Sequence, residues 1–477
     1  MGANTELVTS IGDLVRRAGQ TYGDRPLWTM GDRTVDYATY DDRTTRAASG
    51  LGALGVRPGD RVATYLGNSI ELLEAYTAIA KAGAVTVFCN ALLTQREIDY
   101  VVADSEAVAI ICDREHLAVA RAAAEAAPGL HHVILADTNT AIGTEANNGA
   151  GTDVADGLGA GTEADALTGA EVGKGAIVDW AELVGGDGGR LPGVDVDAEA
   201  WIGYTSGTTG RPKGASLSHR NPMWVAVAVS GALGLRAEDR ILCCLPMFHS
   251  YAVNSCYLQP MLVGAHQRVL PRFGVEEVLD AMAADRTTVF PAVPTMLTYL
   301  ANARGVEAHD LTALRMVVSA GSVLKEQVIA DFEERFGAPI HDGWGSTETG
   351  SFGTITPAGA ARKAGSCGIG LPGSEVRVVD PSGTDVAPGE RGELVVRGPN
   401  VMSHYLNKPD QTAATLVDGW YHSGDVATID TEGYVFVVDR LKDLIISGGY
   451  NIAPKEIEDV ILAHPAVLDV AVVGVAD

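Results

Sequence analysis

One short segment, residues 204–214, gathers the residue types that hold phosphate groups. It supplies hydroxyls, glycines and one lysine: Thr205, Ser206, Gly207, Thr208, Thr209, Gly210 and Lys213. Glycine lets successive backbone N–H groups turn toward one anion, and the hydroxyls add further donors. Lysine adds the point charge that suits a polyphosphate. The GxxxxGK[ST] spacing of a P-loop does not fit, so the segment predicts a different phosphate-binding loop rather than a Ser/Thr/Gly linker.

The charge balance limits the partners of this loop. The chain has 477 residues and a formal net charge of −26. Nucleic acids and anionic membranes bind basic surfaces, so both are excluded as general partners. We therefore expect a nucleotide to be held by a local site with Mg²⁺, backbone N–H groups and a few placed cations.

Other sequence features predict a cytoplasmic protein without a membrane span. The first 17 residues lack the charged and then apolar pattern of a secretion signal. The longest apolar stretch, 222–235, is short and broken by Ser230 and two glycines, so we expect a buried helix there. The six cysteines show neither CxxC nor zinc spacing, which indicates buried thiols in a reducing compartment.

The elements that must position the loop read as an α/β fold. Strand-length apolar runs alternate with helical segments from about 35 to 135 and again from 240 to 319, which predicts layered α/β subdomains. Between them, 136–175 is rich in Gly, Ala and acidic residues and lacks aromatics, which predicts a flexible insertion. From 373 to 439, short strands and turns predict a β-rich subdomain, either an antiparallel sheet or barrel-like.

The last stretch predicts a second, small domain. Residues 440–477 contain a glycine pair, an amphipathic helix over 454–462 that begins with proline, and an apolar run over 467–475 that predicts a strand. These few elements can hardly bury a core alone. We therefore predict a large N-terminal domain over 1–439 and the start of a small, incomplete α+β domain from 440.

Five further segments accompany the phosphate loop in chain order: 245–251, 319–322, 342–349, 419–425 and 439–454. Together the six motifs resemble those of the AMP-forming adenylating superfamily, which comprises acyl- and aryl-CoA synthetases, luciferases and the adenylation domains of peptide synthetases. The resemblance is closest to the acyl-CoA synthetases and runs from about residue 10 to the end. It implies an ATP-dependent carboxylic acid–CoA ligase. The acid attacks the α-phosphate of ATP to give an acyl-adenylate and pyrophosphate, and the thiol of CoA then displaces AMP.

The resemblance also implies roles for nucleotide-binding residues. The loop residues and Lys213 would hold the leaving β,γ-phosphates, and Thr347 would bind the α-phosphate. Glu348 would ligate Mg²⁺, a cation that prefers oxygen ligands. Asp425 would accept the ribose hydroxyls, for which an acceptor-only carboxylate is suited. The remaining nucleotide contacts would come from Arg440 at the ribose or phosphate and from Gly321, Asp342 and Gly343 at the adenine.

The acid, the hinge and the CoA passage are implied in the same way. The acid pocket would be lined by His249, Tyr251, Val253, Ser322, Trp344 and Gly345. Lys442 matches the hinge about which the small domain turns, and Gly448, Gly449 and Tyr450 would line the passage for CoA. Trp344 stands where many relatives carry tyrosine, and its larger ring is expected to wall the pocket. Few charges lie in the pocket segments, which predicts a fatty or other hydrophobic acid rather than an amino acid.

Each residue alone also has an ordinary structural explanation. Thr347 and Glu348 could form a helix N-terminal pair, Asp425 could be a turn residue, His249 a core histidine and Lys442 a solvated side chain. The order of all six segments favours adenylation, with Lys213, Thr347, Glu348 and Lys442 as the catalytic set.

Several alternatives stay open. The acyl acceptor is either CoA or a carrier protein, an amine or another group, and a homodimer is left open as well. A nucleotide-binding protein without turnover is an alternative of another class. It is consistent with the absence, up to Asp477, of the late Pro-x-x-x-x-Gly-Lys lysine of the family. We expect that the printed chain stops before this lysine rather than that the protein lacks it.

Overall fold

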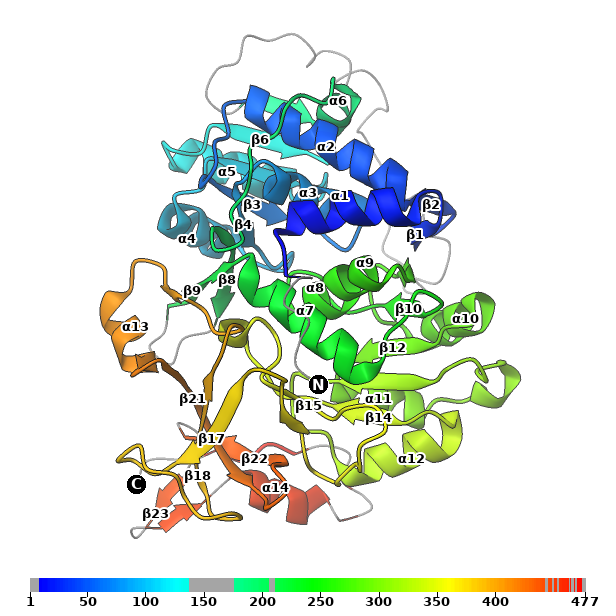
Figure 1. Cartoon of the computed structure of the whole chain (residues 1–477), viewed down its shortest axis with the longest axis vertical. Coiled ribbons are helices and arrows are strands. Elements are labelled where there is room, and N and C mark those ends of the chain that lie inside the picture. Colours follow the sequence, from blue (N-terminus) through cyan, green and yellow to red (C-terminus); the bar gives the residue numbers. More distant parts are fainter. Residues whose placement is uncertain are drawn as a thin grey trace, which may run out of the picture.

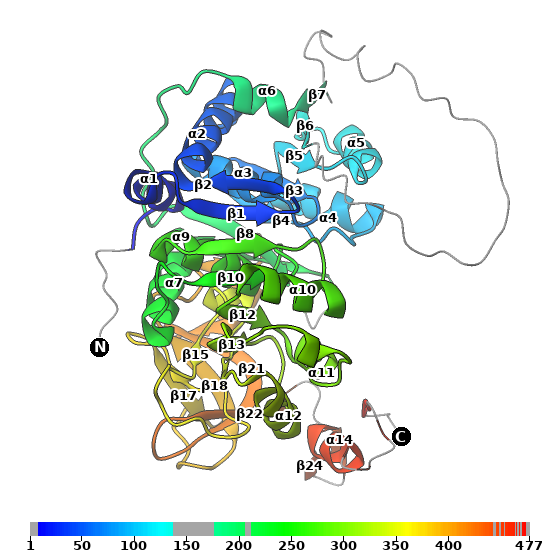
Figure 2. The same ribbon diagram turned by 90° about the vertical axis from the view of Figure 1, so that its right-hand side faces the viewer.

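The computed structural model describes residues 8–136, 176–205 and 211–441, and in the last stretch 445–447, 450–452, 454–462, 464, 467 and 470–473. Apart from residue 136, the predicted insertion 136–175 lies outside the described residues. Figures 1 and 2 show two large sheets stacked along the long axis of the molecule, with an antiparallel sheet beneath them. The predicted α/β class is confirmed, whereas the division between residues 439 and 440 stays a prediction.

The upper sheet has eight strands in the order β19-β9-β8-β4-β3-β5-β6-β7. The strands from β8 to β7 pair in parallel, whereas β9 runs antiparallel to both of its neighbours, β8 and β19. Continuous β-branched and apolar runs fit strands that are covered on both faces. The strands are β3 (Arg61–Tyr65), β4 (Val85–Phe88), β5 (Ala109–Cys112), β6 (His132–Leu135), β7 (Ala176–Asp179), β8 (Glu199–Thr205), β9 (Lys213–Ser218) and β19 (His404–Tyr405).

The middle sheet has seven strands in the order β14-β13-β12-β10-β11-β1-β2, all parallel except β2. They are β1 (Pro26–Met30), β2 (Arg33–Asp36), β10 (Arg240–Cys243), β11 (His266–Val269), β12 (Val289–Ala292), β13 (Met316–Ser319) and β14 (Ile340–Asp342). Most of these strands lie where the sequence predicts them.

Helices fill the space between and around these sheets. Every residue of α3 (Ile70–Lys81) is buried, as expected of a helix that lies between layers. The apolar stretch 222–235 falls largely within α7 (Arg220–Leu233), which confirms the predicted buried helix. The others are α1 (Ile11–Tyr22), α2 (Tyr37–Ala53), α4 (Gln95–Ser105), α5 (Leu117–Ala126), α6 (Trp180–Gly185), α8 (Ser250–Val253), the π-helix η2 (Asn254–Leu258), α9 (Gln259–Val263), α10 (Val275–Asp285), α11 (Pro294–Ala301), the 3₁₀-helix η3 (Val306–Ala308), α12 (Glu326–Phe336), the 3₁₀-helix η4 (Thr347–Thr349) and α13 (Pro409–Thr415).

The β-rich part contains the expected antiparallel sheet. It pairs β17 (Glu375–Val379), β18 (Gly392–Arg397), β20 (Leu416–Val417), β21 (Trp420–Ile429) and β22 (Val435–Arg440). A small ribbon, β15 (Thr354–Ile355) with β16 (Ile369–Gly370), leads into it. Because β21 is ten residues long, it pairs with β18, β20 and β22 and forms the spine of the sheet.

The last described elements are the ribbon β23 (Ile445–Ser447) with β24 (Tyr450–Ile452), and helix α14 (Pro454–Leu462). The helix lies where its amphipathic pattern predicts it. The predicted strand at 467–475 is not formed in the residues described there, 467 and 470–473. Strand pairing needs a partner strand, which an apolar sequence pattern alone does not supply. Within the part of the chain described, no helix combines the length and the apolarity needed to cross a bilayer. All six cysteines are free and buried, as predicted.

Candidate functional site

The predicted nucleotide residues gather at the carboxyl ends of strands in both large sheets. Thr205 is the last residue of β8, Ser319 the last of β13 and Asp342 the last of β14, and Ser319 and Asp342 are register partners. Ligands of open α/β sheets bind beyond such strand ends. Some predicted site residues lie outside the described part of the chain: Ser206, Gly207, Thr208, Thr209, Gly210, Lys442, Gly448, Gly449 and the side chain of Tyr450.

Strands β8 and β9 form a hairpin that carries the phosphate loop at its tip. Thr205 and Lys213 face each other across this hairpin. The Thr205 hydroxyl lies 3.4 Å from the Oε1 atom of Glu348. The Lys213 ammonium lies 4.2 Å from the ring centroid of Tyr405, a distance at which a cation is attracted to an aromatic face. The described residues that flank the loop, Thr205 and Lys213, therefore bring one carboxylate and one cation to its two ends.

Glu348 is buried, with 7% of it exposed, and its carboxylate is held in a defined orientation. The buried Tyr405 hydroxyl donates to its Oε1 atom at 2.7 Å. The backbone places Glu348 in the short helix η4, which Ser346 caps through a reciprocal bond with Thr349. A methyl group at Gly203 would come within 2.5 Å of the Thr347 side chain, so glycine in β8 allows η4 to approach that strand. Thr347 and Glu348 are thus both a helix N-terminal pair and neighbours of the phosphate loop.

Asp425 lies in β21 and meets two nitrogen donors. The indole Nε1 of Trp344 donates to its Oδ2 atom at 2.8 Å, and the Arg440 Nε lies 3.3 Å from its Oδ1 atom. Register pairing of β21 with β22 places Arg440 opposite Asp425. Burial raises the pKa of Asp425, the Trp344 hydrogen bond and Arg440 lower it, and the charge of Glu348 raises it. The carboxylates of Asp425 and Glu348 therefore lie within electrostatic reach of each other.

Asp342 and its neighbouring glycines form a tight strand end. Burial raises the pKa of Asp342 to about 7. Side chains at Gly343 and Gly345 would collide with the backbone of residues 351–354, so this segment needs glycine to pack closely. Gly321, after β13, has φ +97°, in the left-handed region. These groups lie together at the ends of β13 and β14.

The predicted acid-pocket residues are placed differently from one another. His249 and Ser322 are exposed, whereas Val253 is buried in the core. The Tyr251 hydroxyl donates to the carbonyl of Val318 at 2.7 Å, and its ring stands edge-on to another aromatic ring. The indole N–H of Trp344 donates to Asp425, the carboxylate predicted to bind the ribose. Tyr251 is therefore tied to β13, and Trp344 belongs with the nucleotide residues by its contacts.

Two tyrosines of the site were missed by the sequence analysis. Tyr405 meets Glu348 from 57 positions away in the chain, and no local spacing links the two. Tyr421 lies within a segment that the sequence analysis identified, and its hydroxyl accepts a bond from Ser346 at 3.2 Å. Only the pairing of β19 with β9 brings Tyr405 to the phosphate loop, which a linear motif cannot reveal.

The donor set near the loop fits a magnesium ion that arrives with a nucleotide. Mg²⁺ is held in phosphate-transfer sites by one or two carboxylates together with phosphates and waters. Glu348 offers such a carboxylate, and the Thr205 hydroxyl lies beside it. Among the residues that the structure describes, no group of three or more His, Cys, Asp or Glu side chains could form an all-protein metal site.

Comparisons with known proteins agree with this geometry. The family model described as AMP-binding enzyme matches residues 15–406. A feruloyl-CoA synthase from Amycolatopsis sp is 38% identical over 451 residues, which cover 94% of this chain and 82% of that protein. A 4-coumarate–CoA ligase from Oryza sativa subsp. japonica is 34% identical over 461 residues, covering 93% and 78%.

Solved structures extend the likeness to the fold. The crystal structure of the anthranilate CoA ligase AuaEII in complex with anthranoyl-AMP matches with a TM-score of 0.85 and 25% identity, covering 98% of this chain and 85% of that one. ATP-bound MatB from Rhodopseudomonas palustris matches with a TM-score of 0.82 and 28% identity, covering 97% and 86%. The chain therefore belongs to the AMP-binding enzyme family, the adenylate-forming enzymes, and among them to the AMP-forming acid–CoA ligases.

Proposed function

We propose that this enzyme activates an aromatic carboxylic acid, of the aryl or arylpropenoic class, as its acyl-adenylate and then forms the CoA thioester. One observation carries the proposal: Lys213 and Glu348, which stand beside the phosphate loop, share Tyr405, while Asp425 stands within electrostatic reach of Glu348. A cation beside one carboxylate suits a magnesium–polyphosphate, and a second, nearby carboxylate suits ribose hydroxyls.

The proposed division of labour follows the positions of the residues. Lys213 and the loop hold the β,γ-phosphates, and Thr347 orients the α-phosphate. Asp425 accepts the ribose hydroxyls with Arg440 beside it, and Gly321, Asp342 and Gly343 receive the adenine. Glu348 would hold Mg²⁺, which when bound offsets the charge of the phosphates. Catalysis then rests on alignment and charge stabilisation, because the attacking oxygen comes from the substrate itself.

The remaining assignments concern the acid and the thiol. His249, Tyr251, Val253, Ser322 and Gly345 stay our proposed acid-side residues, with Val253 acting from the core behind the pocket. Lys442 stays the proposed hinge, and Gly448, Gly449 and Tyr450 the proposed CoA passage. Lys442, Gly448 and Gly449 lie outside the described residues, as does the side chain of Tyr450.

An aromatic acid is favoured over a fatty acid by two lines of support. The relatives at 38% and 34% identity are named for feruloyl-CoA and 4-coumarate–CoA synthesis, and the matched AuaEII structure holds anthranoyl-AMP. In this chain the Tyr251 ring is pinned through its hydroxyl to the end of β12 and to β13. A pinned aromatic wall offers a flat surface, on which a planar ring packs better than a flexible alkyl chain.

An acid panel tests the proposal. Ferulate, 4-coumarate, anthranilate, benzoate and octanoate are each incubated with ATP and Mg²⁺, with and without CoA, and the products are identified by mass spectrometry. We expect acid-dependent exchange of pyrophosphate into ATP, and aromatic CoA thioesters with AMP once CoA is added. A preference for octanoate would overturn the aromatic assignment. Adenylates that CoA leaves intact would point to a carrier protein or an amine as acceptor, and the absence of any exchange would leave a nucleotide-binding protein without turnover.

A further inference from the structure

The Trp344 indole is held beside Asp425 by two parts of the chain that pack close to its ring. The ring packs against the core of the antiparallel sheet, whose buried members include Leu394 and Ala427. On another side stands Gly353, where a methyl group would come within 2.6 Å of the Trp344 Cζ3 atom. The ring therefore has little freedom to turn, and its Nε1 stays 2.8 Å from Asp425 Oδ2. The indole N–H of this partly buried ring has an acceptor, and that acceptor is a proposed substrate-binding group.

The two donors of Asp425 differ in permanence. The Asp425 side chain is 11% exposed and the Arg440 side chain 60% exposed, and the Arg440 contact is the longer one at 3.3 Å. Arg440 is the last residue of β22, next to the segment that carries the proposed hinge. A long exposed ion pair of this kind contributes little and is easily exchanged. The indole is thus the fixed partner, and the Oδ1 side is the one that can be offered to a ligand.

We propose that Trp344 is a positioning residue for the nucleotide: its indole N–H fixes Oδ2 of Asp425 so that the carboxylate presents Oδ1 to the ribose hydroxyls. The inference rests on the proposed role of Asp425 in ribose binding. An indole is a donor only, so this hydrogen bond has one possible direction, whereas a tyrosine hydroxyl could also accept. The bond therefore stabilises the ionised, acceptor-only form of Asp425.

The environment of Asp425 makes such a donor necessary. Burial raises the pKa of Asp425, and the charges of Glu348 in η4 and Glu393 in β18 raise it further. Trp344 and Arg440 oppose these effects. If the indole donor is lost, the exposed Arg440 alone opposes them, and a larger fraction of Asp425 is protonated. A protonated carboxyl has less acceptor capacity for two hydroxyls.

The test compares nucleotides that differ only in their ribose hydroxyls. Dissociation constants of wild type and Trp344→Phe are measured by calorimetry for ATP, 2′-deoxy-ATP, 3′-deoxy-ATP and 2′,3′-dideoxy-ATP. Since hydrogen bonds to charged groups are the strong ones, we expect Trp344→Phe to weaken ATP binding by about tenfold. The dideoxy nucleotide, which has no hydroxyl for Asp425, should change by less than about twofold. An equal loss for all four nucleotides would assign Trp344 to base stacking or to the fold and overturn the inference.

Two further variants keep the result interpretable. In an Asp425→Asn background, Trp344→Phe should have no additional effect on ATP, because the two residues act through one carboxylate. Trp180→Phe removes the same indole N–H from the buried carboxylate of Glu74, far from the nucleotide residues, and should lower only stability. If Trp344→Phe does not fold, Trp344→Met supplies the same comparison, since its side chain also lacks an N–H or O–H donor. Failure of the wild type to bind ATP would defeat the proposed function instead, so the two failures are distinguishable.

Discussion

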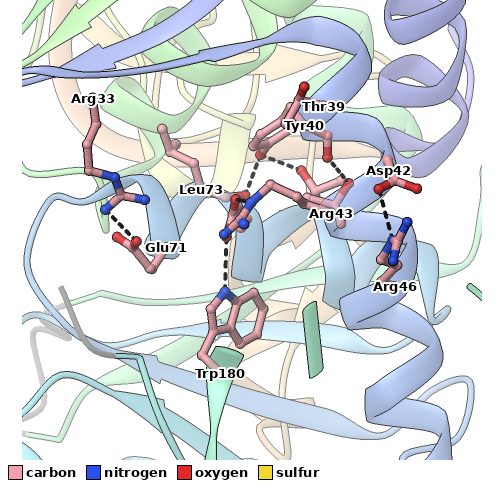
Figure 3. A network of polar contacts seen from close by, with 12 residues as sticks. Arg33, Thr39, Tyr40, Asp42, Arg43, Arg46, Glu71, Leu73 and Trp180 are labelled. Carbon is pink, nitrogen blue, oxygen red and sulfur yellow. Dashed lines mark hydrogen bonds and ion pairs between the residues drawn. The ribbon is translucent and has the colours of Figure 1, made fainter. Parts of the chain in front are cut away.

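A tryptophan indole donates to a carboxylate that an arginine also contacts both in the fold, at Glu74, and in the site, at Asp425. In the fold, Arg43 binds Glu74 through Nε at 2.5 Å and Nη2 at 3.0 Å, and Trp180 donates from Nε1 at 3.0 Å (Figure 3). In the site, Trp344 and Arg440 meet Asp425. The first group is closed, since the Glu74 side chain is 0% exposed and receives three N–H donors. The second is open on its arginine side.

The surroundings widen this difference. Around Glu74, Tyr40 of α2 donates to the carbonyl of Leu73 at 2.6 Å and Arg33 of β2 binds Glu71 at 2.7 Å, so polar groups of α2 and β2 meet partners in α3 (Figure 3). Around Asp425, the charges of Glu348 and Glu393 repel its carboxylate and raise its pKa rather than neutralise it. Functional sites commonly keep such unfavourable charges at the expense of stability. The residue types are therefore the same in the structural group and in the binding group. What differs is whether the carboxylate has a full set of buried donors, as Glu74 has, or keeps an exposed side, as Asp425 does.

The largest expected effect comes from breaking the closed group. Glu74→Gln leaves the Arg43 guanidinium and the Trp180 N–H without a charged acceptor in a buried place. We expect the free energy of unfolding to fall by about 3 kcal/mol, measured by urea unfolding, with ATP affinity unchanged. The control is Asp42→Asn in α2, the helix that carries Arg43; it removes an exposed pair with Arg46 and should cost about 0.5 kcal/mol. Equal effects of the two variants would contradict the closed character of the Glu74 group.

Breaking the open group should have the opposite profile. Asp425→Asn removes a charged acceptor for two ribose hydroxyls, so ATP binding should weaken by about a hundredfold, which corresponds to about 2.7 kcal/mol. Stability should stay level or rise, because burial disfavours the Asp425 charge. Calorimetric titration with ATP and urea unfolding measure the two quantities on one sample. A loss of stability as large as that of Glu74→Gln would remove the distinction between the two groups.

The pH dependence of stability sharpens the comparison through Asp342. Its pKa is raised from the usual 3.8 to about 7 by burial. In this range the native state binds a proton at Asp342 that the unfolded state has lost, so the contribution of Asp342 to stability falls as pH rises from about 4 to about 7. Asp342→Asn should abolish this slope and stabilise the protein by about 2 kcal/mol at pH 7.5, relative to wild type. Urea unfolding at several pH values checks this. Parallel curves for the two proteins would show that Asp342 titrates normally.

The sequence predicts the fold class and the order of the site segments well, because both depend on local patterns. Buried parallel strands are short apolar runs, and Thr205, Ser319 and Asp342 each end one. The order of the motifs along the chain is enough to identify these three positions. The predicted final strand at 467–475 is wrong in the residues described, since an apolar run becomes a strand only beside a partner.

What the sequence cannot predict are contacts between distant segments. Trp344 is expected at the acid pocket from its motif, yet the antiparallel sheet brings its indole to Asp425, 81 positions away. Tyr405 is in no motif that the sequence analysis used. It reaches Glu348 because β19 adds to the edge of the upper sheet beside β9. Sheet topology, rather than local spacing, decides both contacts.

The smallest effect concerns a single hydroxyl in each region. Tyr405→Phe removes the donor that orients Glu348 but keeps the ring beneath the Lys213 ammonium. We expect kcat/KM for ATP to fall by about tenfold, together with a higher Mg²⁺ concentration at half-maximal rate. Steady-state kinetics across a Mg²⁺ series measure both.

The matched change next to the closed group is Tyr40→Phe, which removes the hydroxyl bonds to Leu73 and Thr77. It should lower the free energy of unfolding by about 1 kcal/mol and leave the Mg²⁺ series unchanged. The two variants lose the same atom, so the contrast isolates what surrounds it. Loss of the Tyr40 bond affects only folding. Loss of the Tyr405 bond frees the Glu348 carboxylate, which the nucleotide needs in one orientation. A Tyr405→Phe enzyme with the Mg²⁺ response of wild type would show that η4 alone fixes that carboxylate.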